Sequence, residues 1–180
     1  MTTLQLLGMK HTGKSSIGRL WAQRQGWDFY DLDNLLEVHF GKGRTARQIF
    51  LEDGRTDFQR CETLAAKLIA GRLAQGRVVL AWGGGTITNP DAVEVLRPWG
   101  TSVVLNDRCE VLYERILRGG LPAFLSPEQP WDDFQALYRE RSVLFESFTT
   151  HSLNLADASL EQAVDRLQCL WNTITPTGKS

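Results

Sequence analysis

The stretch LLGMKHTGKSSIG, residues 6–18, carries the most specific pattern in the chain. Its letters Gly8-x-x-x-x-Gly13-Lys14-Ser15 match a P-loop, in which backbone N–H groups surround phosphate oxygens. Glycines are needed because the backbone turns tightly and a Cβ would collide with the phosphate. Lys14 would bridge the outer phosphates, and the Ser15 hydroxyl would be a ligand of Mg²⁺. The residues expected to bind phosphate groups are Gly8, Met9, Lys10, His11, Thr12, Gly13, Lys14, Ser15 and Ser16.

The neighbours of this loop in the sequence support the match. An apolar run, residues 4–7, precedes it and an amphipathic run, residues 15–24, follows it, so the loop connects a strand to a helix as the mechanism requires. The letters of residues 12–15 occur again at 177–180, where neither element flanks them. We interpret the second occurrence as a coincidence.

Two aspartates follow the next short apolar stretch, in the letters FYDLDN. Asp31 and Asp33 project to the same side if the chain is extended there. Near a P-loop, one such carboxylate can hold the magnesium shell while the other accepts the proton of an attacking hydroxyl. The alternative is that Asp31 or Asp33 only caps the helix that follows. Taken alone, the motif supports the two interpretations equally.

Three consecutive glycines end a third apolar stretch, VLAWGGGT. Gly83, Gly84 and Gly85 expose backbone N–H groups where a strand leaves the sheet, which permits close approach of a ligand. No acidic residue ends this strand, so we assign the magnesium carboxylate to Asp31. The tryptophans are expected to pack in the core and at its rim, and Trp82, just before the glycines, is the one that could instead form a pocket wall.

Short apolar runs alternate with longer helical patterns along the chain, which predicts a mainly parallel sheet covered by helices on both faces. In such sheets ligands bind beyond the carboxyl ends of the strands, where the three motifs lie. The expected strands are 4–7, 28–30, 78–81, 102–105 and 151–155. The expected helices are 15–24, 32–40, 46–52, 56–74, 91–96, 110–117, 131–148 and 160–171.

Charge and cysteine content narrow the class of protein. The 180 residues include 20 basic and 21 acidic side chains, a formal net charge of −1. A nearly neutral chain has no overall electrostatic attraction for nucleic acid or for an anionic membrane, so we expect neither as a partner. Cys61, Cys109 and Cys169 are far apart and lack CxxC spacing, which argues against a disulfide framework and a zinc site. We expect a cytoplasmic protein, because neither a secretion signal nor an 18-residue apolar span is found.

Four segments together resemble the shikimate kinase family in order and spacing: GMKHTGKSSIGRLWAQRQGWDFYDLDNLLE, TARQIFLEDGRTDFQRCE, LAWGGGTI and YRERSVLFESF. The resemblance implies the nucleoside-monophosphate-kinase fold, an α/β/α sandwich with a five-stranded parallel sheet in the order 2-3-1-4-5. It also implies transfer of the γ-phosphoryl group of ATP to the 3-hydroxyl of shikimate, with Mg²⁺. We therefore expect one P-loop kinase domain at residues 1–174, with a substrate-binding helical segment at about 32–62, a lid at about 117–131 and a flexible tail at 175–180.

The resemblance also assigns roles to single residues. It makes Lys14 and Asp33 catalytic, with Asp33 binding and deprotonating the substrate hydroxyls. It places Ser15 and Asp31 at the magnesium ion. Further expected substrate-binding residues are Gln59, Gly83, Gly84, Gly85 and Arg141, and Arg115 and Arg118 are expected to contact the nucleotide.

Two arginines of the family pattern are replaced in this chain. Where the family reads Phe-Arg-x-x-Glu, residue 59 is Gln59, and where its lid reads Arg-Pro-Leu-Leu, Leu121 stands first. Each charge-assisted bond from arginine to carboxylate contributes about 1.5–3 kcal/mol. Losing two would therefore lower affinity by roughly two to four decades. The arginines that either compensate or remain solvated at the surface are Arg55, Arg60 and Arg118.

Three functions compete at this point. The first is a shikimate kinase with a repaired carboxylate site, and the second is a kinase of the same fold with another small hydroxylated acceptor. The third is an ATP-binding regulatory module with little catalysis. Intact Lys14 and Asp33 argue against the third, since a protein that only bound nucleotide would not need Asp33. We expect a monomer whose partner is a small-molecule substrate.

Overall fold

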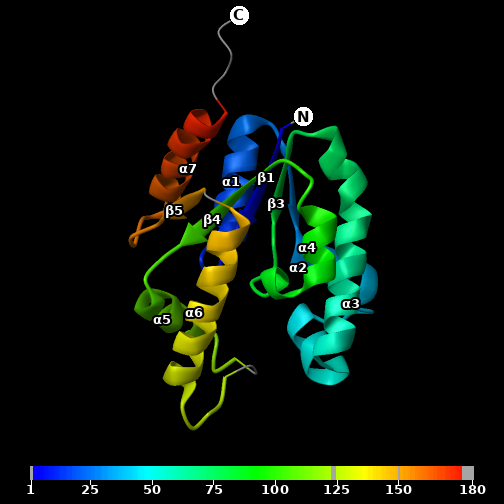
Figure 1. Ribbon diagram of the computed structural model, residues 1–180, viewed down its shortest axis with the longest axis vertical. Helices are drawn as coiled ribbons and strands as arrows, with labels where there is room; N and C mark the ends of the chain where they lie inside the picture. The colour runs from blue at the N-terminus through cyan, green and yellow to red at the C-terminus, as the bar shows by residue number, and fades with distance from the viewer. Residues whose placement is uncertain (1, 123–124, 150, 176–180) are drawn as a thin grey trace, which may run out of the picture.

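A five-stranded parallel sheet forms the centre of the structure, a computed structural model that describes residues 2–122, 125–149 and 151–175 (Figure 1). The order of the strands is β2-β3-β1-β4-β5, which confirms the order that the resemblance implied. All four neighbouring pairs are parallel, so the strands end at one common edge. The strands are β1 (Thr3–Leu7), β2 (Asp28–Asp31), β3 (Val78–Ala81), β4 (Thr101–Asn106) and β5 (Ser152–Asn154).

Helices cover both faces of the sheet (Figure 1). Alternate residues of β1 point to opposite faces, so that Leu4 and Leu6 join one hydrophobic cluster and Leu7 joins the other. The first cluster takes side chains from α1 (Lys14–Gln25) and α7 (Leu160–Ile174). The second takes them from α2 (Leu32–Phe40), α3 (Ala46–Gln75), α4 (Pro90–Leu96), α5 (Cys109–Leu117) and α6 (Pro130–Phe148).

The predicted strands and helices are all found, with boundaries shifted by a few residues. The two helices expected at 46–52 and 56–74 form the single element α3. Its backbone is interrupted at Gly54, whose φ of 81° and ψ of 175° are not helical, which explains the break in the sequence pattern. A short 3₁₀ turn, η1 (Thr86–Thr88), follows the three glycines and was not predicted.

Trp82 is a core residue, so of the two alternatives that the sequence left open the structure supports core packing and not a pocket wall. Its side chain is only 2% exposed, and its ring packs edge-on against Phe148 at a centroid distance of 5.2 Å. The indole N–H donates to Oε1 of Gln5 at 2.7 Å. Gln5, buried in the central strand, also donates through Nε2 to the carbonyl of Leu96 at 3.0 Å. These bonds satisfy the polar groups of the Trp82 and Gln5 side chains, which the core encloses.

The expected lid and tail are only partly described. The segment from Arg118 to Gln129, between α5 and α6, contains no helix or strand at its described positions and omits residues 123 and 124. Of the expected tail, residues 176–180 lie outside the described residues. No helix in the described ranges has the length and apolar character needed to span a membrane.

Candidate active site

The P-loop, residues 8–13, joins the end of β1 to the start of α1. Gly8 has a φ of 141° and Gly13 a φ of 89°, and both values strain any residue with a Cβ. A Cβ at Gly8 would lie 2.3 Å from the carbonyl oxygen of Leu105 in β4. Gly8 is therefore needed to pack the loop against β4, a cause that sequence reasoning did not identify.

Lys14 folds back into the P-loop. Its ammonium donates to the carbonyl oxygens of Gly8 at 3.0 Å and Met9 at 2.9 Å, and the residue is 7% exposed. Burial lowers the pKa of Lys14 to about 8, while the nearby charges of Asp33 and Asp31 oppose the shift. The cation is thus held inside the loop that is expected to bind phosphate.

Asp31 caps a helix and also contacts Ser15 at the start of α1, so its role as a cap does not exclude the predicted role at the metal. Oδ1 accepts the backbone N–H of Asp33 at 3.0 Å and that of Asn34 at 3.3 Å, which caps α2. Oδ2 accepts the hydroxyl of Ser15. Two neighbouring oxygen donors suit Mg²⁺, which binds proteins through one or two side chains and keeps waters or phosphates as its other ligands. The described residues contain no cluster of three or more His, Cys, Asp or Glu at metal-binding distances.

Asp33 lies in surroundings that disfavour its charge. Burial raises the pKa of Asp33 to about 6, and the neighbouring carboxylates Asp31 and Glu62 add to the rise. A carboxylate with a pKa near the working pH is suited to accept a proton from a substrate hydroxyl.

The three glycines after β3 allow three functional residues to approach the backbone. A Cβ at Gly83 would lie 2.5 Å from Oδ1 of Asp33. At Gly84 it would lie 2.9 Å from the backbone nitrogen of Lys10 in the P-loop. Gly85 faces the Arg141 guanidinium, with Nη2 3.4 Å from the position of a Cβ. The glycine run therefore brings the proposed base, the P-loop and the arginine together.

A cavity of about 320 Å³ lies among these groups, and we name it the acceptor cavity. Its walls combine three cationic side chains, two carboxylates and a mainly apolar remainder. Gly83 and Gln59 are absent from its lining. The lining residues are Lys10, His11, Asp33, Ala46, Arg47, Phe50, Phe58, Glu62, Gly84, Gly85, Ile116, Gly119, Gly120, Pro122 and Arg141.

Arg141 and Glu62 are held in place by short polar contacts. Nη1 of Arg141 donates to the carbonyl of Gly84 at 2.9 Å, while its buried Nε has no hydrogen-bond partner within the described part of the chain. Glu62 accepts hydrogen bonds from Thr86 and from Nδ2 of Asn89, the latter at 2.8 Å, and burial raises the pKa of its carboxyl. The free Nε leaves Arg141 able to bind an anion.

The other arginines considered from the sequence lie outside the acceptor cavity. Arg60 is exposed and pairs with Asp57 at 3.4 Å, and neither it nor Arg55 lines the cavity. Gln59 instead donates to the carbonyl of Thr88 at 3.2 Å. Arg47, which does line the cavity, was missed, because nothing in the sequence distinguishes it from a surface arginine.

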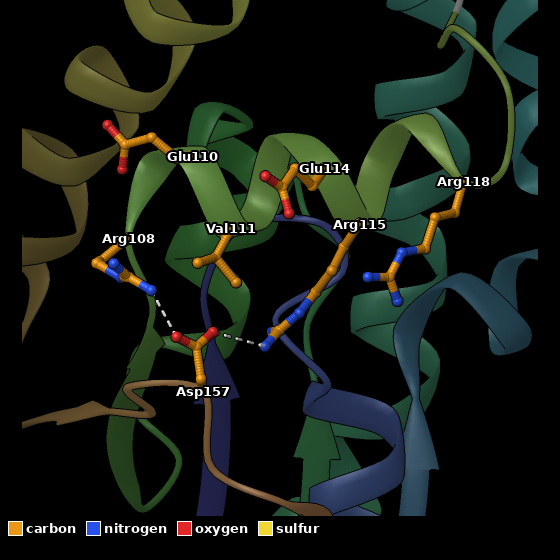
Figure 2. Close-up of a pocket in the computed structure, with 7 residues that line it drawn as sticks. All are labelled: Arg108, Glu110, Val111, Glu114, Arg115, Arg118 and Asp157. Carbon is orange, nitrogen blue, oxygen red and sulfur yellow. Dashed lines mark hydrogen bonds and ion pairs between the residues drawn. The ribbon is translucent and has the colours of Figure 1, made fainter.

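Arg115 and Arg118 line a second cavity, of about 420 Å³, beside α5 (Figure 2). Nη2 of Arg115 lies 3.0 Å from Oδ2 of buried Asp107 and 3.9 Å from Oδ1 of Asp157. Figure 2 shows Arg108 and Arg115 approaching Asp157 from two sides. Asp107 and Asp157 follow β4 and β5 at the carboxyl edge of the sheet, a signal that sequence reasoning did not use.

Comparisons with known proteins agree with the geometry. A family model described as shikimate kinase matches residues 10–170. A shikimate kinase of Pelotomaculum thermopropionicum is 30% identical over 167 residues, which cover 93% of this chain and 94% of the relative. One of Symbiobacterium thermophilum is 36% identical over 142 residues, which cover 78% and 79%. The solved structure of a shikimate kinase from Acinetobacter baumannii in complex with shikimate has a TM-score of 0.83 and 26% identity, covering 100% of this chain and 96% of that one.

Proposed function

The chain belongs to the shikimate kinase family, and on that premise we propose that its acceptor is shikimate, phosphorylated on the 3-hydroxyl. It is an ATP-dependent phosphotransferase that acts on a hydroxyl group. The observation that supports the acceptor most strongly is the acceptor cavity, which Asp33 and Arg141 both line. A small hydroxylated carboxylic acid requires both groups.

Each residue of the proposed mechanism acts on a defined atom. Asp33 accepts the proton of the 3-hydroxyl, and the oxygen forms a bond to the γ-phosphorus of ATP. The bond from that phosphorus to the β–γ bridging oxygen breaks, and ADP leaves. Lys14 stabilises the negative charge that collects on the phosphate oxygens. Arg141 binds the carboxylate of the acceptor and orients its hydroxyl toward Asp33.

The contact between Ser15 and Asp31 supports magnesium as the metal of this reaction. Ser15 would be a direct ligand and Asp31 would hold the hydration shell, and Mg²⁺ when bound neutralises phosphate charge. The cavity beside α5 is proposed to take the nucleotide base, with Arg115 and Arg118 against it. We also propose a cytoplasmic location, because three free cysteines suit a reducing compartment, and we keep the monomer expected in the sequence analysis as a proposal.

The test is an ADP-release assay with shikimate and a panel of polyols and hydroxy acids, with product identification by ³¹P NMR. We expect shikimate to give the highest kcat/KM and a 3-phosphate product.

Asp33→Asn should lose phosphoryl transfer by at least about 10²-fold while its ATP affinity stays close to that of the wild type, because Asp33 serves the acceptor. Equal loss of both would assign Asp33 to the metal.

Gln59 and Leu121 favour one specific alternative, a kinase whose acceptor lacks a carboxylate. In the same assay, turnover of an uncharged polyol without turnover of shikimate would establish that alternative. Tight ATP binding with no turnover of any acceptor would instead favour the regulatory module.

A further inference from the structure

We propose that Arg47 supplies the positive charge that the family pattern places at the lid arginine, and that it binds the acceptor carboxylate together with Arg141. This inference rests on the proposed function, since it names the residue that determines specificity for a carboxylate in the same cavity. Neither the sequence motifs nor the resemblance points to Arg47.

The position of Arg47 carries the proposal. Its side chain lines the acceptor cavity, and Nη2 donates to the carbonyl oxygen of Leu121 at 3.5 Å, the outer limit for a hydrogen bond. Leu121 is the residue at which the family pattern has its lid arginine. The Arg47 guanidinium therefore lies beside the backbone from which the missing side chain would extend, and it approaches from α3 instead of from the lid.

Arg47 does not stabilise the helix on which it lies. It is the second residue of α3, whose first turn is capped by Thr45 and Gln48, and a cation in the first turn opposes the helix dipole. Arg44, just before the helix, pairs with Glu52 and Asp53 at 3.0 Å and 2.8 Å. No carboxylate within the described ranges lies within 4.0 Å of the Arg47 guanidinium. The charge of Arg47 is therefore free to bind an anion from outside the protein.

The charges around the acceptor cavity fit one additional anion. Lys10, Arg47 and Arg141 supply three cations and Asp33 and Glu62 two carboxylates, which leaves one net positive charge when both acids are ionised. Binding a single carboxylate neutralises the cavity.

The Nε of Arg141 is buried without a hydrogen-bond partner in the described structure, and Arg47 has no ion-pair partner there. Lys10 also lines the cavity, but its ammonium is a point charge, whereas a planar guanidinium can bind a carboxylate through two parallel hydrogen bonds. We therefore assign the carboxylate to the two guanidinium groups.

The experiment compares shikimate with its methyl ester, which keeps the ring hydroxyls and removes the negative charge. We would measure kcat/KM for both acceptors in wild type, Arg47→Ala, Arg47→Lys and the control Arg60→Ala, which removes an arginine from the same helix outside the cavity. For Arg47→Ala we expect the KM for shikimate to rise about 10- to 100-fold, with kcat and the KM for ATP changed little. Its preference for shikimate over the ester should fall by the same factor, and Arg47→Lys should retain part of it.

A charge-relocation variant distinguishes a direct role from a structural one. Arg47→Ala combined with Leu121→Arg should recover most of the lost preference, because it returns the cation to the family position. The melting temperature of Arg47→Ala should equal or slightly exceed that of the wild type. An unchanged preference in Arg47→Ala, with wild type active on shikimate, would overturn the role of Arg47 alone. A wild type inactive on shikimate would overturn the proposed function and this inference with it.

Discussion

Asp31 and Asp33 are two residues apart and have different properties because their surroundings differ. Asp31 accepts hydrogen bonds from two backbone N–H groups and from the Ser15 hydroxyl. Asp33 is enclosed beside Gly83 and near Glu62, where burial and like charge favour the protonated form. One carboxylate is thus suited to a metal shell and the other to proton transfer.

The pH dependence of the reaction should report Asp33 and Lys14. The proposed base acts when ionised, so its raised pKa predicts that kcat/KM for shikimate falls as the pH drops below about 6. Lys14, the proposed phosphate ligand, acts when protonated. Its lowered pKa therefore predicts that kcat/KM also falls as the pH rises above about 8. The measurement is kcat/KM from pH 4.5 to 9.5 at constant ionic strength.

The variant Lys14→Arg tests whether Lys14 causes the fall in activity at high pH. Residual activity of Lys14→Arg should no longer fall above about pH 8, since a guanidinium stays charged there. A rate that stays constant down to pH 4.5 would show that Asp33 titrates normally and would contradict its assignment as the base.

The elements position these groups through close backbone contacts. The P-loop touches β4 at Gly8, and α1 lies against the sheet at Gly18, where a Cβ would come within 2.8 Å of the Phe29 ring and 2.9 Å of Leu6. Glycine at both positions lets a strand, a loop and a helix approach more closely than side chains permit. The location of Lys14, at the start of α1, follows from this packing.

Two glycine-to-alanine changes should have opposite effects on stability. Gly8→Ala places a Cβ against the Leu105 carbonyl at a positive φ, so we expect a loss of at least about 3 kcal/mol or no folded protein. Gly71→Ala lies on an exposed turn of α3, where the added Cβ would meet no atom within 4 Å outside the backbone of its own helix, and it should add about 0.5–1 kcal/mol to the free energy of unfolding. Urea unfolding of both variants measures the difference. Wild-type stability in Gly8→Ala would contradict the contact with β4.

In the whole molecule, the acceptor cavity exists because segments far apart in the chain meet at the carboxyl edge of the sheet. Its walls come from the P-loop, α3, the glycine run, the segment after α5, and α6. Arg141 reaches Gly84 across 57 residues of sequence, and Arg47 reaches Leu121 across 74. Acceptor specificity is therefore a property of tertiary packing and not of one motif.

Restoring the family arginines should strengthen binding of shikimate. Gln59→Arg and Leu121→Arg together should lower its KM about tenfold or more, and by more than either change alone if both side chains meet the same carboxylate. The measurement is a shikimate titration at saturating ATP and Mg²⁺. Leu51→Arg, which adds the same charge at an exposed site of α3, is the control and should leave KM unchanged.

A submillimolar wild-type KM for shikimate would contradict the premise of a weakened pocket. It would mean that the carboxylate is already bound tightly without the two family arginines.

The motifs that reside in short, continuous segments could be predicted from the sequence. The P-loop lies between β1 and α1 as its spacing requires, and Asp31 caps α2 within three residues. Apolar periodicity located the strands and helices, because burial of one or both faces imposes a local pattern. The strand order and the family came from the resemblance, and the structure agrees with both.

The placement of single side chains was decided by the tertiary structure. Trp82 follows a strand as a pocket residue would, yet a hydrogen bond to Gln5 holds it in the core. Arg60 and Arg47 are both exposed arginines of α3, and only Arg47 meets the lid segment and the acceptor cavity. Local sequence determines which backbone conformation forms, whereas the neighbours of a long side chain depend on how distant segments pack, so the cation that reaches the acceptor is visible only in the folded molecule.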